Sequence, residues 1–348
     1  IWLLTNGVRE QASHAASVAG KKRVPGTIEA LGKALRRPEP EVRGAAARSL
    51  GTLRDIAGLE SLAAVLAITK DEAEAQLFTD QAIAIIGVQP LEQVITIGES
   101  PDPTIRQLAV KALPEFSKDR VNPRVMEVLG KHAKDSDQSI RRAAIYALAR
   151  VKSPAVTRSL LNEHKKNRDA VVREQVAFSV RTSDIPEAEE AILSFLNDAD
   201  GQVKIQALRA VRERKIAKAF DTLRMLLSYR DPEVKREVFR SFMVLATPGD
   251  PNLFDTYNRL LYDSDPEVRL MAVNSLEPYG KDSRTADALG GAVTDQDDRV
   301  KLRSLAILSD SENPSAVEQV IRGLFDRSKT VKMGALDALE KLASTKAI

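Results

Sequence analysis

The sequence predicts an all-α solenoid of stacked helical hairpins, and three observations lead to this prediction. A short phrase with helix-capping chemistry recurs along the chain, the apolar residues after it are spaced four apart, and the composition favours helix over sheet. Aromatic residues make up only 4% of the 348 residues, whereas sheets are enriched in aromatic and β-branched side chains. With 43% apolar and 29% charged residues, the chain can bury apolar faces and solvate the others, which argues against disorder.

The recurring phrase is Asp, often Pro, any residue, a β-branched anchor and a basic residue. It is clearest at Asp231–Lys235 and Asp265–Arg269, and Asp102–Arg106 is a third copy. Successive anchors lie 31 to 36 residues apart, except for one interval of 27. Eleven copies at this period indicate a repeat array, in which each unit packs only on its neighbours. The anchor positions are Val8, Val42, Phe78, Ile105, Ile140, Val172, Val203, Val234, Val268, Val300 and Val331.

Each part of the phrase has a physical role at the start of a helix. The Asp three residues before the anchor is expected to be the N-cap, because its carboxylate accepts a hydrogen bond from a free N–H of the first turn. Pro at the next position suits a site where no backbone donor is needed. The anchor and the residues four and eight further on, such as Val268, Ala272 and Leu276, lie on one helical face.

A second amphipathic helix precedes each of these, for example over Ile28, Leu31 and Leu35. The predicted unit is therefore helix, turn, helix, and about eleven units form a single solenoid over residues 1–348. Ile1 to Leu4 resemble the end of a first helix, and the chain does not open with Met. We therefore expect an array that starts within a repeat, in an N-terminally truncated or processed chain.

Two segments depart from the repeat. The copy at Phe78 has Ala75 in place of the capping Asp and Thr79 in place of the basic residue. We expect a longer or irregular helix there, with a local change in superhelical pitch. Residues 246–251, Ala-Thr-Pro-Gly-Asp-Pro, predict a lengthened turn. The repeat resumes directly after both segments, so neither is interpreted as a domain linker.

With these motifs in view, the chain resembles the HEAT-repeat family, in particular the short bacterial repeats also found in phycobilin lyase-type proteins. The Asp-Pro-x-Val-Arg phrase with Ala and Leu four apart carries the resemblance from Val8 to Leu342. The resemblance implies a right-handed superhelix whose second helices line the concave face. It also implies a structural ladder, in which the basic residue after each anchor bonds to capping acids of adjacent repeats. These residues are Arg9, Arg43, Arg106, Arg141, Arg173, Lys204, Lys235, Arg269, Lys301 and Lys332.

Few residues are available for catalysis. The chain has no Cys, which excludes disulfides, thiolate catalysis and Cys-ligated metals. His14, His132 and His164 have no His, Asp or Glu at metal-ligand helical spacing beyond what chance gives, and we interpret them as three surface histidines. There is no Gly-x-Ser-x-Gly motif and no phosphate-binding Gly loop. We therefore predict a protein that is not an enzyme and has no cofactor or metal.

The candidate binding residues lie on the second helices, two, six and nine residues past the anchor, where side chains should point to the concave side. In the central repeats these positions are mostly basic, whereas the outer repeats hold residues such as Gly44, Ala84 and Asp337. A concave surface with one sign of charge raises the local potential. The candidates for partner binding are Lys111, Arg142, Tyr146, Arg181, Arg209, Arg212, Arg236 and Arg240.

The functional prediction is a non-catalytic scaffold or adaptor that binds a protein, such as an acidic segment, on this basic stripe. The alternative for the stripe itself is an ordinary solvated face. Alternative functions are a bilin lyase-type enzyme subunit, which rests on fold analogy alone, and a nucleic-acid-binding solenoid. Nucleic acid is disfavoured because the net charge is only +3 and aromatics near the stripe are few. Leu270, Met271, Leu302 and Met333 form a second, apolar candidate patch, for which packing between neighbouring second helices is favoured.

The compartment is weakly determined by the sequence. The absence of Cys favours an exported or periplasmic bacterial protein, and a cytoplasmic one stays open. No run approaches the ~18 consecutive apolar residues of a membrane-spanning helix. The oligomeric state and the identity of the partner are not predicted.

Overall fold

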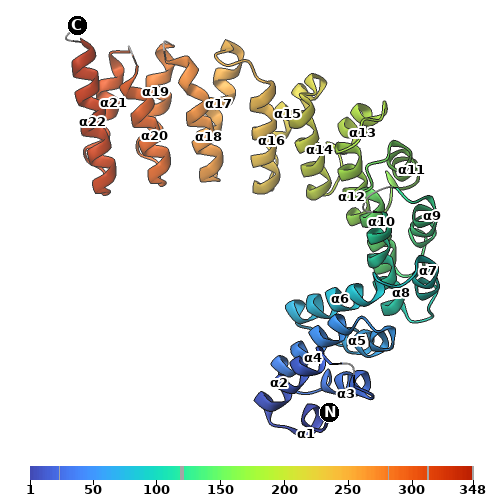
Figure 1. The fold of residues 1–348 in the computed structure, drawn as a ribbon. Helices are drawn as coiled ribbons and strands as arrows, with labels where there is room; N and C mark the ends of the chain where they lie inside the picture. The colour runs from blue at the N-terminus through green and yellow to red at the C-terminus, as the bar shows by residue number, and fades with distance from the viewer. Residues whose placement is uncertain (23, 118–120, 281, 312, 347–348) are drawn as a thin grey trace. The chain divides into compact units, whose positions relative to one another are not determined.

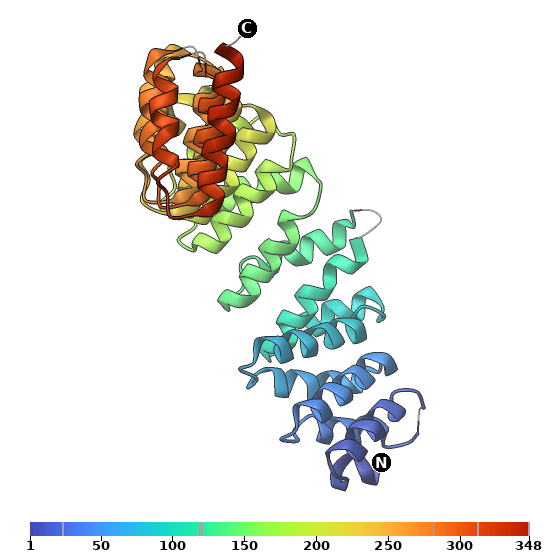
Figure 2. The same ribbon diagram turned by 90° about the vertical axis from the view of Figure 1, so that its left-hand side faces the viewer.

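The computed structural model describes residues 1–22, 24–117, 121–280, 282–311 and 313–346. Over these residues it contains twenty-two α-helices, five short 3-10 helices and no strand. The α-helices form eleven consecutive hairpins, which confirms the predicted all-helical repeat fold. By their internal contacts the residues fall into two compact units, Ile1–Pro186 (unit 1) and Glu187–Ile348 (unit 2). Within each unit, successive hairpins lie side by side (Figures 1 and 2).

Unit 1 holds the first six hairpins. Their second helices, the even-numbered ones, pack on one another in sequence, and each first helix packs on its own second helix (Figure 1). The helices are α1 Trp2–Asn6, α2 Arg9–Ala19, α3 Thr27–Ala34, α4 Pro40–Leu53, α5 Leu59–Leu66, α6 Glu72–Ile86, α7 Leu91–Gly98, α8 Pro103–Ala112, α9 Pro123–His132, α10 Gln138–Ala149, α11 Pro154–His164 and α12 Ala170–Arg181.

Unit 2 holds the other five hairpins and is built in the same way. Its helices are α13 Ala188–Phe195, α14 Gly201–Arg214, α15 Phe220–Leu226, α16 Pro232–Leu245, α17 Phe254–Leu260, α18 Pro266–Leu276, α19 Ser283–Ala292, α20 Asp298–Ser309, α21 Ser315–Gly323 and α22 Lys329–Lys346. We call the surface formed by the even-numbered helices of either unit its second-helix face.

The capping residues predicted from the sequence are N-caps in the structure. The side chain of each accepts a hydrogen bond from a backbone N–H of the first turn, as Asp137 does from Ser139 at 2.7 Å. The seven capping residues are Asp102, Asp137, Asp169, Asp200, Asp231, Asp265 and Asp297. Each satisfies a donor that the helix cannot satisfy itself, which sets where these seven second helices begin.

The predicted apolar stripe forms the core between hairpins. Val268, Ala272 and Leu276 are all fully buried, and the recurrent Ala lets neighbouring second helices approach closely. Two expectations about this pattern are wrong. Val8 is not a buried anchor but the N-cap of α2, with an exposed side chain, and Ala12 and Ala16 fill the core instead. The helix of the Phe78 copy does have a capping acid, Asp71, which lies four residues before Ala75.

Because Asp71 caps it, α6 begins about one turn earlier than its neighbours relative to the anchor. The helix is 15 residues long, which confirms the longer helix expected there. Thr79, at the position of the missing basic residue, is buried. The interval of 27 residues to the next anchor follows from this early start.

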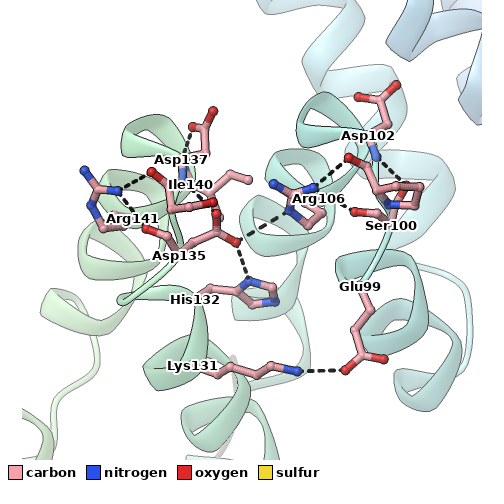
Figure 3. Close-up of polar contacts among 12 residues, drawn as sticks. Glu99, Ser100, Asp102, Arg106, Lys131, His132, Asp135, Asp137, Ile140 and Arg141 are labelled. Carbon is pink, nitrogen blue, oxygen red and sulfur yellow. Dashed lines mark hydrogen bonds and ion pairs between the residues drawn. The ribbon is translucent and has the colours of Figure 1, made fainter.

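A polar ladder links consecutive hairpins, and Figure 3 shows part of it in unit 1. The guanidinium of Arg106 donates to the carbonyls of Ser100 and Pro101, in the turn before its own helix. It also lies 3.5 Å from the Asp135 carboxylate of the next repeat. Asp135 in turn accepts from the backbone N–H of the capping residue Asp137 at 2.8 Å. One side chain therefore fixes its own turn and the neighbouring turn together.

The partner expected for the basic residue of the ladder, a capping acid of the adjacent repeat, is wrong. The basic residue pairs not with the capping acid of the next repeat but with an acid two residues before it. Lys235 pairs with Asp263, Arg269 with Asp295 and Lys301 with Asp326, at 2.7 to 2.8 Å. Lys204 instead has its ammonium 5.3 Å from the centre of the Tyr229 ring, a cation–π contact at the equivalent position. Arg43 differs, since it pairs with Glu74 inside α6.

The predicted lengthened turn is present in unit 2, between α16 and α17. Gly249 has a φ of 77°, a left-handed conformation that favours glycine, and Asp250 caps the short helix Pro251–Leu253. The buried hydroxyl of Tyr279 donates to the carbonyl of Asp250 at 2.6 Å. The Tyr279 ring packs edge-on against Phe254, so this turn is held by the aromatic core of the next hairpin.

Tyr279→Phe is expected to lower the free energy of unfolding of unit 2 by about 1 kcal/mol, because it removes one buried hydrogen bond. The control is Tyr262→Phe, whose ring is 74% exposed and for which no change is expected. Urea unfolding monitored by hydrogen exchange of α17 and α18 measures both. Equal stability of the two variants would contradict this role for Tyr279.

Candidate functional site

The predicted binding residues divide evenly between the units. Lys111, Arg142, Tyr146 and Arg181 belong to unit 1, and Arg209, Arg212, Arg236 and Arg240 belong to unit 2. The structure brings three of the first four together around one groove. In unit 2 it places three of the four arginines in ion pairs with carboxylates of the same unit.

The groove of unit 1 crosses its second-helix face over α6, α8, α10 and α12 and has a volume of about 660 Å³. This volume lies in the range of ligand-binding clefts. Apolar side chains such as Ile83, Pro114 and Ala143 line it, and Lys111, Arg142 and Tyr146 are among the polar and aromatic residues around them. Thr79 of the degenerate copy also lines the groove, so the departure from the repeat coincides with this site.

Tyr146 is the exposed aromatic of the groove, with 52% of its surface accessible. The guanidinium carbon of Arg150 lies 3.2 Å from the centre of the Tyr146 ring and 4.7 Å from that of Phe178. Arg150 also donates to the Gln175 side chain and to the Tyr146 carbonyl, at 2.8 and 2.9 Å. The ring is thereby held in one orientation before any partner arrives, which reduces the entropy lost on binding.

The charge of Arg142 is largely neutralised by a carboxylate of the same unit. Its guanidinium makes two hydrogen bonds, of 2.7 and 2.9 Å, to the carboxylate of Asp169, the cap of α12. These bonds lower the pKa of Asp169 to about 2, although partial burial opposes the shift. Arg142 therefore links two repeats in the manner of the ladder, and its net charge toward a partner is small.

Lys111 is different, because it makes no hydrogen bond or ion pair with any of the described residues. Burial lowers the pKa of Lys111, and the charge of Asp80 opposes this shift. It lies in the last turn of α8, and its side chain is exposed. Arg181 of the same unit has its guanidinium 5.2 Å from the centre of the Phe178 ring and does not line the groove. Lys111 is therefore a cation of the groove that forms no ion pair with the described residues.

The unit 2 candidates cluster around the buried Glu237. Arg212 and Arg240 each pair with its carboxylate at 2.8 Å, and Arg236 pairs with the capping Asp265 at 2.7 Å. Burial alone would raise the pKa of Glu237, but the two guanidiniums hold it below its usual value. Arg209 is half-buried and forms no ion pair within the described part of the chain. The positive charges of the unit 2 candidates are therefore largely neutralised by carboxylates of the same unit.

Sequence reasoning missed Arg150 and Gln175, which complete the groove. Arg150 lies ten residues past its anchor, outside the positions selected from the repeat. It also missed the acids two residues before the caps, although the pairs Asp135/Asp137, Asp263/Asp265 and Asp295/Asp297 are visible in the sequence. In the apolar candidate patch, Met333 is 50% exposed. The Leu302 side chain packs against Gly334 and would have to shift if a larger residue stood there.

The interpretation of the histidines as three surface residues is wrong for two of them. Only His14 is exposed, whereas His132 and His164 are buried at the ends of α9 and α11. Burial lowers the pKa of His132, against the opposing effect of Asp135, whose carboxylate lies 3.7 Å from Nδ1 (Figure 3). Burial likewise lowers the pKa of His164, with Glu163 opposing the shift and Lys134 adding to it.

No group of three or more His, Asp or Glu side chains among the described residues could hold a metal ion. No helix in the described part of the chain is long and apolar enough to cross a membrane.

The family model and one solved structure support the helical-repeat architecture. A family model of HEAT repeats matches residues 2–78 and 88–181. A chain in a model of the full-length AP-3 complex in an intermediate open conformation is 10% identical, with a TM-score of 0.56 over 96% of this chain and 72% of that one. A crystal structure of an engineered protein is 22% identical over 98% and 97% of the two chains, with a TM-score of 0.37. No curated protein matches the sequence.

Unit 1 is expected to lose stability as the pH falls below about 6.5, the pKa of histidine in an unfolded chain. His132 and His164 have lowered pKa values when folded, so below that pH the unfolded state binds more protons than the folded one. The loss is at most about 1.4 kcal/mol per pH unit for each histidine.

Hydrogen exchange of α9 and α11 at pH 7 and pH 5, corrected for intrinsic rates, measures this loss. The double variant His132→Asn, His164→Asn should flatten the dependence, and the control His14→Asn should not. A pH dependence that survives the double variant would assign the effect to other groups.

Proposed function

The chain belongs to the HEAT-repeat family, and from this premise we propose that it is a non-catalytic scaffold that binds a protein partner in the groove of unit 1. HEAT repeats form solenoid scaffolds for protein interactions. One observation carries the proposal for this chain. The groove combines apolar walls, an exposed and immobilised Tyr146, and Lys111 with no carboxylate partner among the described residues.

The chemistry of the groove favours a segment that carries an apolar side chain beside a carboxylate. The apolar side chain would cover Tyr146 and Ala143, where an aromatic anchor gives a large contact area at low entropic cost. The carboxylate would pair with Lys111, which forms no ion pair with the described residues and on which only the electrostatic effect of Asp80 opposes the burial that lowers its pKa. The proposed binding site is therefore a short part of unit 1 and does not include all eight candidate residues.

The same ion pairs argue against a nucleic-acid backbone as the partner. Binding to a phosphate backbone requires many cations free to contact it. Here Arg142, Arg212, Arg236 and Arg240 are paired with Asp169, Glu237 and Asp265. A protein segment needs only one or two charges together with an apolar contact, which is what the groove offers.

The test selects linear peptides from a random phage-displayed library against the immobilised full chain. The selected peptides should share an acidic residue next to an apolar one. Tyr146→Ala should weaken their binding by about tenfold or more, as expected for an aromatic anchor. Lys111→Glu should weaken it by a similar factor at low salt.

The matched controls lie in unit 2. Tyr262→Ala removes another exposed tyrosine, and Arg209→Glu reverses another cation without an ion pair, and neither should change the affinity. Peptides that share no acidic residue, or that bind the Tyr146→Ala variant as well as the parent, would contradict the proposed site.

A further inference from the structure

A second cavity of unit 1 lies away from the second-helix face, between the first helices α9 and α11. Its volume is about 370 Å³, and it shares no lining residue with the groove. Its walls are largely apolar and include Met126, Val156 and Leu160. We call it the α9–α11 cleft.

His164 lines this cleft and is its distinctive polar residue. Its side chain is only 9% exposed, and its imidazole makes no hydrogen bond or ion pair with the residues that the structure describes. His132, the equivalent residue of α9, faces the carboxylate of Asp135 instead. Because no described residue uses its hydrogen-bonding nitrogens, the His164 ring is a group that a ligand in the cleft could satisfy.

Gly130 leaves the cleft open. A Cβ atom added at Gly130 would meet no other atom within 4 Å, so the space beside α9 is not filled by a neighbouring side chain. Glycine in the interior of a helix costs about 1 kcal/mol relative to alanine. Unit 1 thus carries an unfavourable residue at the position where a larger one would obstruct the cleft.

The charges at the edge of the cleft are already paired. Lys134, just after α9, and Glu163 of α11 form an ion pair of 2.9 Å across it. Glu163 also accepts a hydrogen bond from Ser159 at 2.8 Å. A charged ligand would have to disrupt this arrangement, whereas a neutral one would not.

From these observations we propose that the α9–α11 cleft binds a small phenol ring, with the hydroxyl hydrogen-bonded to His164. A planar ring suits apolar walls. A phenol hydroxyl can either donate or accept, so it fits whichever ring nitrogen of His164 carries the proton. The proposal does not depend on the function assigned to the groove.

The test is a ¹⁹F NMR titration of the full chain with 4-fluorophenol and with fluorobenzene, which differ only in the hydroxyl. The phenol should bind saturably. Fluorobenzene should bind about fivefold more weakly, the factor that corresponds to one hydrogen bond of ~1 kcal/mol.

Two variants separate binding in the cleft from binding elsewhere. Gly130→Leu fills the cleft with a better helix former, so it should abolish binding of both probes while the fold is kept. His164→Leu should remove the preference for the phenol. Peptide binding in the groove should be the same in the parent and in Gly130→Leu. The proposal is overturned if 4-fluorophenol shows no saturable binding, if Gly130→Leu leaves binding unchanged, or if the two probes bind equally.

Discussion

The structure depends most on the polar ladder, which joins one turn to the next at Arg106, Lys235, Arg269 and Lys301. A single helical hairpin cannot cover its own apolar faces, so every hairpin must stack on neighbours in one register. Apolar packing alone would allow neighbouring helices to slide along one another, because Val and Ala side chains recur along each helix. The Arg269 guanidinium removes this freedom by donating to the carbonyl of Asp263 and to the carboxylate of Asp295. With side chains only 13% and 9% exposed, this pair is largely withdrawn from solvent and therefore depends on close geometry.

This ladder also determines what the surface can offer to a partner. Several arginines that the sequence suggests are available for a partner instead connect repeats. Arg142 pairs with Asp169, and Arg236 pairs with Asp265. The available functional groups lie where the repeat is irregular. In unit 1, Thr79 replaces the basic residue of the ladder, α6 begins a turn early, and the groove lies against that helix. A local departure from the repeat is thus the origin of the candidate site.

Much of the fold could be predicted from the sequence, because each helix start has a chemical signature in a few adjacent residues. The recurring anchor predicted all eleven second helices, seven of them with a capping Asp three residues before it, although Val8 is a cap and not an anchor. The partners of the side chains could not be predicted in the same way. Whether Arg142 is free depends on Asp169, which lies 27 residues away and reaches it only after the hairpins stack. The burial of His164 similarly follows from the packing of α11.

The central claim is that the ladder couples neighbouring repeats, and a double-mutant cycle on Arg269 and Asp295 tests it most directly. Arg269→Met, Asp295→Asn and the double variant would be compared by native-state hydrogen exchange of α18 and α20 in the full chain. The two substitutions should be non-additive, with a coupling free energy of about 2 kcal/mol. Additive effects of the two substitutions would show that the pair does not hold the repeats together and would contradict this account.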